Sequence, residues 1–334
     1  MHENGGRLGV AHRCRIDLIR LELVNTLLPY LCGLSHGYPY IGINDICVLC
    51  RILHILSQRD RRTGFFRDLL TDAYQLLIRK TAWIGTRLEC FDVIGSTNTA
   101  AMQMAEEGAP HGTLVVADRQ DSGKGRRGRA WIVPAGIAIA MSIVLKPQEL
   151  LPEHAPQLTL VVALAVARAI EQQTGLPVQI KWPNDIVIDG KKMCGILTEM
   201  STQIDYINHI VVGIGINVHN EQFPEELSDR ATSLYLSSGG RRYSRAALVE
   251  AVCEQFEYFY GIFMQTQDMS GLKEVYDDCL VNRGRTVRIL DPKGEYEGVA
   301  QGITPQGALE VDTADGRRLV DSGEVSVRGV YGYV

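Results

Sequence analysis

Residues 119–131, RQDSGKGRRGRAW, hold the densest group of chemically capable side chains in the sequence. Five cations stand there against the single acid Asp121, and Gly123, Gly125 and Gly128 make the backbone permissive. Guanidinium groups on a flexible backbone suit a phosphate or pyrophosphate that must be enclosed during a reaction. A solvated basic loop is the alternative explanation of this segment.

Residues 123–128 also match G-x-G-x-x-G, yet two common nucleotide-binding motifs do not fit. A dinucleotide fold needs a helix directly behind the glycines, whereas Trp131 and Pro134 follow here. A P-loop needs a terminal G-K-[ST], which this segment lacks. If the segment binds phosphate, it therefore does so as a loop of another kind.

A second group, Lys-Trp-Pro-Asn-Asp, occupies residues 181–185. Lys181 ends an expected strand, and Pro183 restricts the chain just behind it. A lysine held there could stabilise two oxyanions at once, such as a carboxylate and an α-phosphate. A surface lysine in a turn is the alternative. Asn184 and Asp185 could bind a metal or a ribose, or could shape the turn.

Two glycine-containing segments follow, GKKMCGIL at residues 190–197 and GIGIN at residues 213–217. Lys192 could reach a nucleotide phosphate. A glycine inside a strand, such as Gly195, suggests the close approach of a ligand or a neighbouring strand. For Gly213 and Gly215 a packing explanation serves equally well.

Together these segments resemble the biotin protein ligase family. The matching motifs are STN at residues 96–98, GKGRRGR at 123–129, KWPND at 181–185, GKKMCGIL at 190–197 and GIGIN at 213–217. Their order and spacing also match, and the resemblance covers roughly residues 80–334. Five ordered motifs are far more specific than any one of them.

The resemblance implies an enzyme that uses ATP and Mg²⁺ to convert biotin to biotinyl-5'-AMP. It then transfers biotin to a lysine of a biotin carboxyl carrier protein domain, as in acetyl-CoA carboxylase. The implied catalytic residues are Lys181 and Arg126. The implied biotin-binding residues are Ser96, Thr97, Asn98, Gln120, Lys124, Gly125, Arg126, Lys181 and Gly195. The implied nucleotide-binding residues are Arg127, Arg129, Asn184 and Lys192. No protein ligand is assigned to the metal, which is expected to arrive with the ATP phosphates.

One residue departs from the family's pattern. Lys124 stands where the family usually has arginine. Lysine keeps the charge but loses the planar fork of guanidinium, so weaker retention of the adenylate is expected.

Three other functions are considered, and each differs from a biotin ligase in a specific feature. A lipoate or octanoate ligase-type acyl transferase shares the catalytic fold, although the arginine-rich loop and KWPND favour biotin. A biotin-responsive DNA-binding repressor would need a working N-terminal module. A biotin-binding protein without catalysis would release no pyrophosphate.

The segments between the motifs must form the framework that positions them. Asp189-Gly190 predicts a hairpin turn. Strands that arrive as hairpins, with helices between groups, predict an α/β (α+β) fold with a mixed β-sheet flanked by helices. Strands are expected at 87–93, 113–118, 137–145, 178–181, 186–188, 193–199 and 210–218, and helices at 99–107 and 158–173.

Three domains are predicted: an N-terminal helical region over 1–80, a biotin/ATP-binding catalytic domain over 81–281, and a small SH3-like β-barrel over 282–334. Short strands at 286–290, 296–303, 308–312, 318–321 and 324–328 indicate the barrel. The first 75 residues show no convincing turn, recognition helix or wing, so repressor function is not carried over from the family.

Composition is that of an ordinary globular protein, with 334 residues, 46% apolar residues and a net charge of −5. The chain as a whole therefore lacks the basic bias of many DNA-binding proteins. Eight irregularly spaced cysteines are expected to be reduced, which indicates the cytoplasm. The most apolar run, residues 158–167, is too short to span a bilayer. Family members often dimerise through a sheet edge, and homodimer formation remains open.

Overall fold

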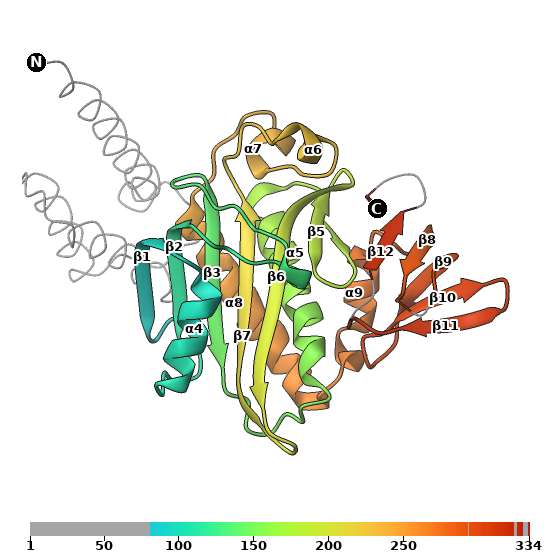
Figure 1. Cartoon of the computed structure of the whole chain (residues 1–334), viewed down its shortest axis with the longest axis horizontal. Helices are drawn as coiled ribbons and strands as arrows, with labels where there is room; N and C mark the ends of the chain where they lie inside the picture. Colours follow the sequence, from blue (N-terminus) through green and yellow to red (C-terminus); the bar gives the residue numbers. More distant parts are fainter. Residues whose placement is uncertain (1–80, 293, 324–325, 330–332) are drawn as a thin grey trace, which may run out of the picture. The chain divides into compact units, whose positions relative to one another are not determined.

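The computed structural model describes residues 81–292, 294–323, 326–329 and 333–334. The helical region expected over residues 1–80 lies outside this part of the chain. The described residues form a seven-stranded sheet with helices, followed by a five-stranded sheet (Figure 1). Both sheets were predicted from strand patterns and turn signals.

The larger sheet has the strand order β1-β2-β3-β7-β6-β5-β4. Its first pair, β1 and β2, is parallel, and every other neighbouring pair is antiparallel. The expected mixed sheet is therefore confirmed. Its strands are β1 (Leu88–Ile94), β2 (Leu114–Gln120), β3 (Ala138–Leu145), β4 (Gln179–Lys181), β5 (Asp185–Ile188), β6 (Lys191–Thr202) and β7 (Ile207–Asn217).

Helices cover both faces of this sheet. In Figure 1, α4 (Thr97–Glu106) lies in front of the sheet, whereas α5 (Leu158–Thr174) and α8 (Arg245–Thr266) lie behind it. Most of α5 is buried because its sequence is apolar on nearly every side, and it ends at Gly175 in the left-handed conformation. Two short helices, α6 (Glu225–Ser228) and α7 (Leu234–Ser237), follow β7.

The hairpin that joins β5 to β6 turns at the predicted dipeptide. Asp189 has φ 50° and Gly190 has φ 74°. Positive φ at both central residues is the requirement of a type I′ turn, whose twist matches that of the flanking strands. This turn aligns Asp185 with Gly195 across the hairpin and so brings the KWPND and GKKMCGIL segments together.

The C-terminal sheet has the strand order β11-β10-β9-β8-β12, with all pairs antiparallel. Its closure as an SH3-like barrel stays a prediction. The strands are β8 (Thr286–Leu290), β9 (Tyr296–Ile303), β10 (Leu309–Thr313), β11 (Gly316–Val320) and β12 (Ser326–Gly329).

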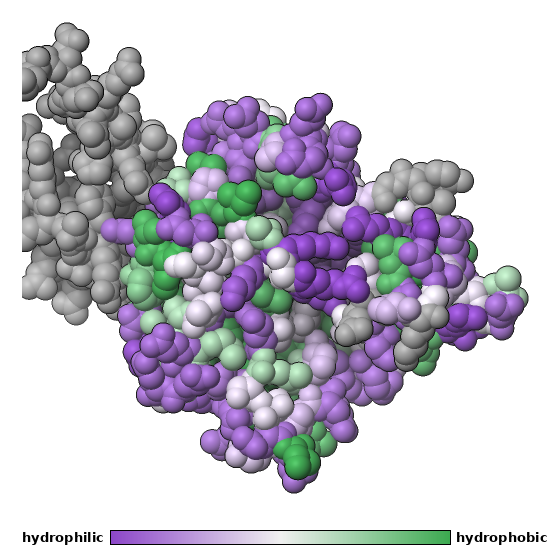
Figure 2. Space-filling model, viewed as in Figure 1, coloured by the Kyte–Doolittle hydropathy of each residue, from purple (hydrophilic) through white to green (hydrophobic). Residues whose placement is uncertain are grey.

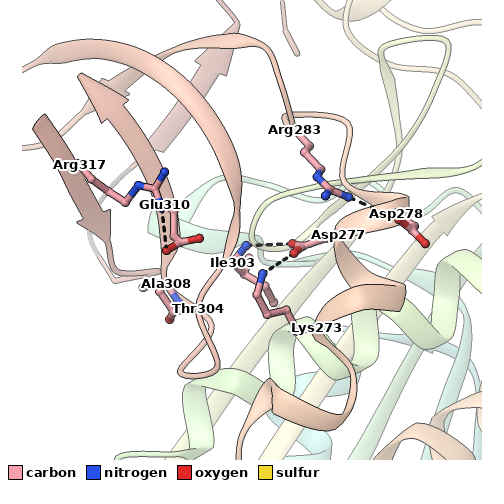
Figure 3. Close-up of polar contacts among 9 residues, drawn as sticks. All are labelled: Lys273, Asp277, Asp278, Arg283, Ile303, Thr304, Ala308, Glu310 and Arg317. Atoms are coloured by element: carbon pink, nitrogen blue, oxygen red, sulfur yellow. Dashed lines mark hydrogen bonds and ion pairs between the residues drawn. The ribbon is translucent and has the colours of Figure 1, made fainter. Parts of the chain in front are cut away.

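Helix α9 (Lys273–Cys279) attaches this sheet to the rest of the described chain (Figure 3). Asp277 accepts a hydrogen bond from the Ile303 amide at 2.9 Å and pairs with Lys273 at 2.5 Å. Trp182, next to Lys181, donates from its indole to the Gly307 carbonyl at 3.1 Å. The C-terminal sheet is therefore held close to the KWPND segment.

Two further expectations concern cysteines and membranes. The described cysteines, Cys90, Cys194, Cys253 and Cys279, are buried and not joined by disulfides. No described helix has the length and apolarity to cross a membrane.

Candidate active site

A pocket forms where the N-terminus of α4, the end of β2 and the strands β6 and β7 meet. Most of the predicted ligand-binding residues line it, although they come from segments far apart in the chain. They are Ser96, Thr97, Asn98, Gln120, Lys124, Gly125, Arg126, Asn184, Lys192 and Gly195. Three predicted residues, Lys181, Arg127 and Arg129, are not part of its lining.

The glycine-arginine loop between β2 and β3 crosses the front of the sheet toward β6 (Figure 1). Backbone pairs hold its arms together, because Trp131 N donates to Gly123 O at 2.9 Å and Gln120 N to Val133 O at 3.3 Å. A Cβ at Gly123 would lie 2.3 Å from Trp131 O, so glycine is needed there. Figure 2 shows hydrophilic side chains in the middle of this face.

Trp131 is a pocket residue that the sequence did not identify. A Cβ at Gly215 would lie 2.2 Å from its Nε1, and one at Gly195 would lie 3.4 Å from its ring. These glycines therefore make room for the indole on β7 and β6. Its Nε1 is buried and has no hydrogen-bond partner among the described residues.

The arginines of the loop reach toward the C-terminal sheet. Arg126 donates to Asn184 Oδ1 at 3.1 Å, to Gly323 O at 2.7 Å and to Ser322 O. Arg127 donates to Ser326 Oγ at 2.9 Å. Burial lowers the pKa of Arg126, against an opposing effect of Asp185. The C-terminal sheet thus helps to fix one guanidinium group at the pocket wall.

Lys181 lies beside the pocket, under the aromatic ring of Tyr333. The Lys181 ammonium is 3.4 Å from the ring centroid, and the residue is 4% exposed. Burial lowers the pKa of Lys181 to about 7, while Asp185 acts in the opposite direction and Arg328, Lys192 and Arg129 lower it further. The Tyr333 hydroxyl donates to Asp185 Oδ2.

Asp185 is the centre of this charged cluster. Its Oδ1 lies 2.5 Å from Lys192 Nζ. Burial acts to raise the pKa of Asp185, but the charge and hydrogen bond of Lys192, the Tyr333 hydroxyl and Lys181 together lower it. Asp185 therefore holds Lys192 in the pocket, which favours a structural role within the site.

Because the Tyr333 ring covers the Lys181 amine, Tyr333→Ala should expose it. Burial is the main cause of the lowered pKa of Lys181, so exposure would raise that pKa toward its ordinary value. The gain in reactivity toward acetic anhydride would come from access of the reagent to the amine and is best measured at about pH 9. We expect several-fold faster acetylation of Lys181 in Tyr333→Ala, measured by peptide mass spectrometry. Tyr333→Phe keeps the ring, so acetylation of Lys181 should stay slow in that variant. Equal acetylation rates in the wild type and both variants would show that the Tyr333 ring does not shield the Lys181 amine.

The other end of the pocket carries neutral polar groups. Ser96 caps α4 and accepts from Thr99 N at 3.5 Å. Thr97 N donates to Gln120 Oε1 at 2.7 Å. A Cβ at Gly213 would lie 2.0 Å from Asn98 Oδ1, so this glycine admits the Asn98 side chain. The pocket thus has an uncharged hydrogen-bonding end and a cationic end.

Two protein-family models match this chain, one over the strands of the larger sheet and one over those of the C-terminal sheet. The family model described as "Biotin/lipoate A/B protein ligase family" matches residues 90–217, and that described as "Biotin protein ligase C terminal domain" matches residues 284–328. The chain is 40% identical over 250 residues to the bifunctional ligase/repressor BirA of Bacillus spizizenii, covering 74% of this chain and 76% of that protein.

Two further relatives extend the likeness. The biotin–[acetyl-CoA-carboxylase] ligase of Mycobacterium tuberculosis is 29% identical over 276 residues, which cover 81% of this chain and 98% of that protein. The solved structure of the Aquifex aeolicus biotin protein ligase in complex with biotin and ATP has a TM-score of 0.65 and 32% identity. It covers 73% of this chain and 99% of that chain.

Proposed function

This chain belongs to the biotin protein ligase family, and we propose that it activates biotin with ATP and transfers it to a lysine of a carrier protein. One observation carries this proposal: a single pocket gathers the STN, glycine-arginine, KWPND and GKKMCGIL segments. The solved relative that binds biotin and ATP shares this fold.

The proposed division of labour follows the two ends of the pocket. Ser96, Thr97, Asn98 and Gln120 would meet the ureido ring, whose polar edge needs partners when buried. Lys181 and Arg126 would meet the reacting carboxylate and phosphate, with Lys124, Gly125 and Gly195 completing the biotin site. The nucleotide would contact Arg127, Arg129, Asn184 and Lys192.

The chemical difficulty is electrostatic, because a carboxylate must attack the α-phosphate of ATP. Lys181 and the arginine loop would screen the repulsion and stabilise the charge that builds up in the transition state. Enclosure by the loop would keep water from the acyl-adenylate. Transfer then needs a well-placed neutral lysine amine of the carrier.

Mg²⁺ fits this site as a companion of the nucleotide. Among the described residues no three His, Cys, Asp or Glu side chains are grouped to hold a metal ion, and the buried Asp185 already pairs with Lys192. Magnesium is commonly bound by substrate phosphates with few protein ligands. Bound there, Mg²⁺ would neutralise part of the negative charge of the ATP phosphates.

The remaining assignments extend the same proposal. Residues 81–281 would be the catalytic domain and residues 282–334 the C-terminal domain, with residues 1–80 forming a separate N-terminal region. The acceptor would be a biotin carboxyl carrier domain in the cytoplasm. Dimerisation through a sheet edge is a further expectation drawn from the family.

The proposal is tested by pyrophosphate release from the purified full chain with MgATP. Biotin should stimulate release, and lipoate or octanoate at the same concentration should not. Stimulation by lipoate or octanoate alone would favour the acyl transferase alternative. No stimulation by any of the three acids would contradict ligase activity.

Binding of the biotin carboxylate beside Lys181 should take up a proton. The ligand-free pKa of Lys181 is about 7, so this amine is mostly neutral at pH 8, and a nearby anion raises its pKa. We expect uptake of about one proton at pH 8 and almost none at pH 6. Binding enthalpies in buffers of different ionisation enthalpy measure this. Equal uptake at both pH values would contradict it.

Lys124 offers a test of adenylate retention. It lines the pocket as a lysine, so Lys124→Arg would add a planar donor toward the bound intermediate. We expect several-fold slower dissociation of biotinyl-5'-AMP in a chase experiment. An unchanged rate would show that the fork of the guanidinium does not matter here.

A further inference from the structure

Behind the uncharged end of the pocket, a chain of hydrogen bonds begins at Glu199 on β6. Asn98 Nδ2 donates to Glu199 Oε2 at 2.8 Å and to Leu197 O at 3.3 Å. A carboxylate and a main-chain carbonyl can only accept hydrogen bonds. The amide nitrogen of Asn98 must therefore face β6, and its oxygen must face away from it.

The orientation of Asn98 decides the direction of the next bond. Its Oδ1 lies 2.6 Å from Ser142 Oγ, and Ser142 Oγ also lies 2.8 Å from Thr97 Oγ1. Serine has one hydroxyl hydrogen, and the amide oxygen can only accept it. Ser142 is fully buried, so water offers no substitute partner. The Ser142 hydrogen therefore goes to Asn98 rather than to Thr97.

The orientation of the Ser142 hydroxyl in turn determines where the Thr97 hydroxyl hydrogen points. Because Ser142 cannot donate to it, Thr97 directs its own hydrogen into the protein, toward Ser142 Oγ at 2.8 Å or Gln120 Oε1 at 3.0 Å. Thr97 lines the pocket and is left with lone pairs for a ligand. It presents a hydrogen-bond acceptor.

Gln120 supplies the complementary group. Its Oε1 already accepts from Thr97 N at 2.7 Å, so its amide nitrogen is left to donate. No acceptor for that nitrogen is found among the described residues. An acceptor beside a donor suits an N–H next to a C=O, as in a cyclic urea. A dithiolane ring or an alkyl chain offers neither group.

We propose that Glu199 is a specificity-determining residue, which orients Asn98, Ser142 and Thr97 so that the pocket recognises the –NH–CO– edge of its ligand. Glu199 acts through Asn98 and does not touch the ligand, so it is a positioning residue. The inference rests on the proposed function, because the ureido ring of biotin supplies that edge.

The test compares Glu199→Met with Glu199→Gln in the full chain. Methionine has a similar length but cannot accept from Asn98, whereas the glutamine oxygen can. We expect Glu199→Met to raise the KM for biotin about tenfold, with kcat, the KM for ATP and the melting temperature unchanged. Glu199→Gln should restore the wild-type value. The exposed Glu254→Met on α8 is the control for the substitution itself.

Two additional variants separate positioning from folding. Glu199→Thr suits a strand but is too short to reach Asn98, and it should show the same loss. In a Ser142→Ala background, Glu199→Met should cause no further loss, because the link to Thr97 is already cut. Additive losses, or a wild-type KM for biotin in both Glu199→Met and Glu199→Thr, would overturn the inference and leave the ligase intact. A wild-type chain that does not bind biotin would overturn both.

Discussion

Lys181→Met should reduce biotin-dependent pyrophosphate release by roughly 100- to 1,000-fold, the usual effect of removing one group that stabilises a developing oxyanion. Its ammonium is buried and lies close enough to Asp185 for the two charges to interact, and the reacting carboxylate and α-phosphate need such a charge between them. Biotin binding should weaken far less, because the groups proposed to meet the ureido ring lie at the other end of the pocket.

Lys191→Met provides the matched control for this substitution. Lys191 begins β6, two strands from Lys181 in the same sheet, and its ammonium donates an exposed hydrogen bond to Ser228 O at 2.9 Å. Its removal should leave pyrophosphate release unchanged. Equal losses in the two variants would mean that the general charge of the region matters rather than the position of Lys181.

Gly213→Ala should weaken biotin binding about a hundredfold, because the new methyl group would displace Asn98 and break about two hydrogen bonds. The added Cβ would lie 2.0 Å from Asn98 Oδ1 and 2.9 Å from its Nδ2, closer than side-chain atoms pack. Asn98 is 5% exposed and has little room to move. Isothermal titration with biotin measures the change.

Gly261→Ala on α8 is the control for adding a methyl group to the chain. No atom lies within 4 Å of a Cβ built there, so biotin affinity should not change. Wild-type affinity in Gly213→Ala would contradict the proposed role of Asn98. A loss in both variants would point to a general effect on stability.

Much of the framework was predictable because local patterns agree with tertiary structure. The strand over residues 286–290 and that over 296–303 were predicted at their observed bounds. Other predicted ends differ by a few residues. The predicted strand 193–199, for example, is part of the longer Lys191–Thr202, since cross-strand pairing with β7 continues beyond the apolar pattern.

The residues in and around the pocket that were missed are those whose roles depend on long-range contacts. Tyr333 meets Asp185 from 148 positions away. The alternating pattern of its strand predicts that Glu199 faces outward, whereas its hydrogen bond with Asn98 joins residues 101 positions apart. Ser142 did leave a signal, as the lone polar side chain in the apolar strand AIAMSIVL. Trp131 followed the arginine motif, but its place on Gly215 required the fold.

The most direct test of the proposed ligase reaction follows an oxygen atom from biotin. Biotin labelled with ¹⁸O in its carboxyl group is incubated with the full chain, MgATP and hydroxylamine as the acyl acceptor. Attack of the carboxylate on the α-phosphate, followed by acyl transfer, leaves one biotin oxygen on AMP. Activation of biotin as an acyl-adenylate predicts AMP carrying one ¹⁸O and unlabelled pyrophosphate; unlabelled AMP, or ¹⁸O in inorganic phosphate with formation of ADP, would contradict this reaction.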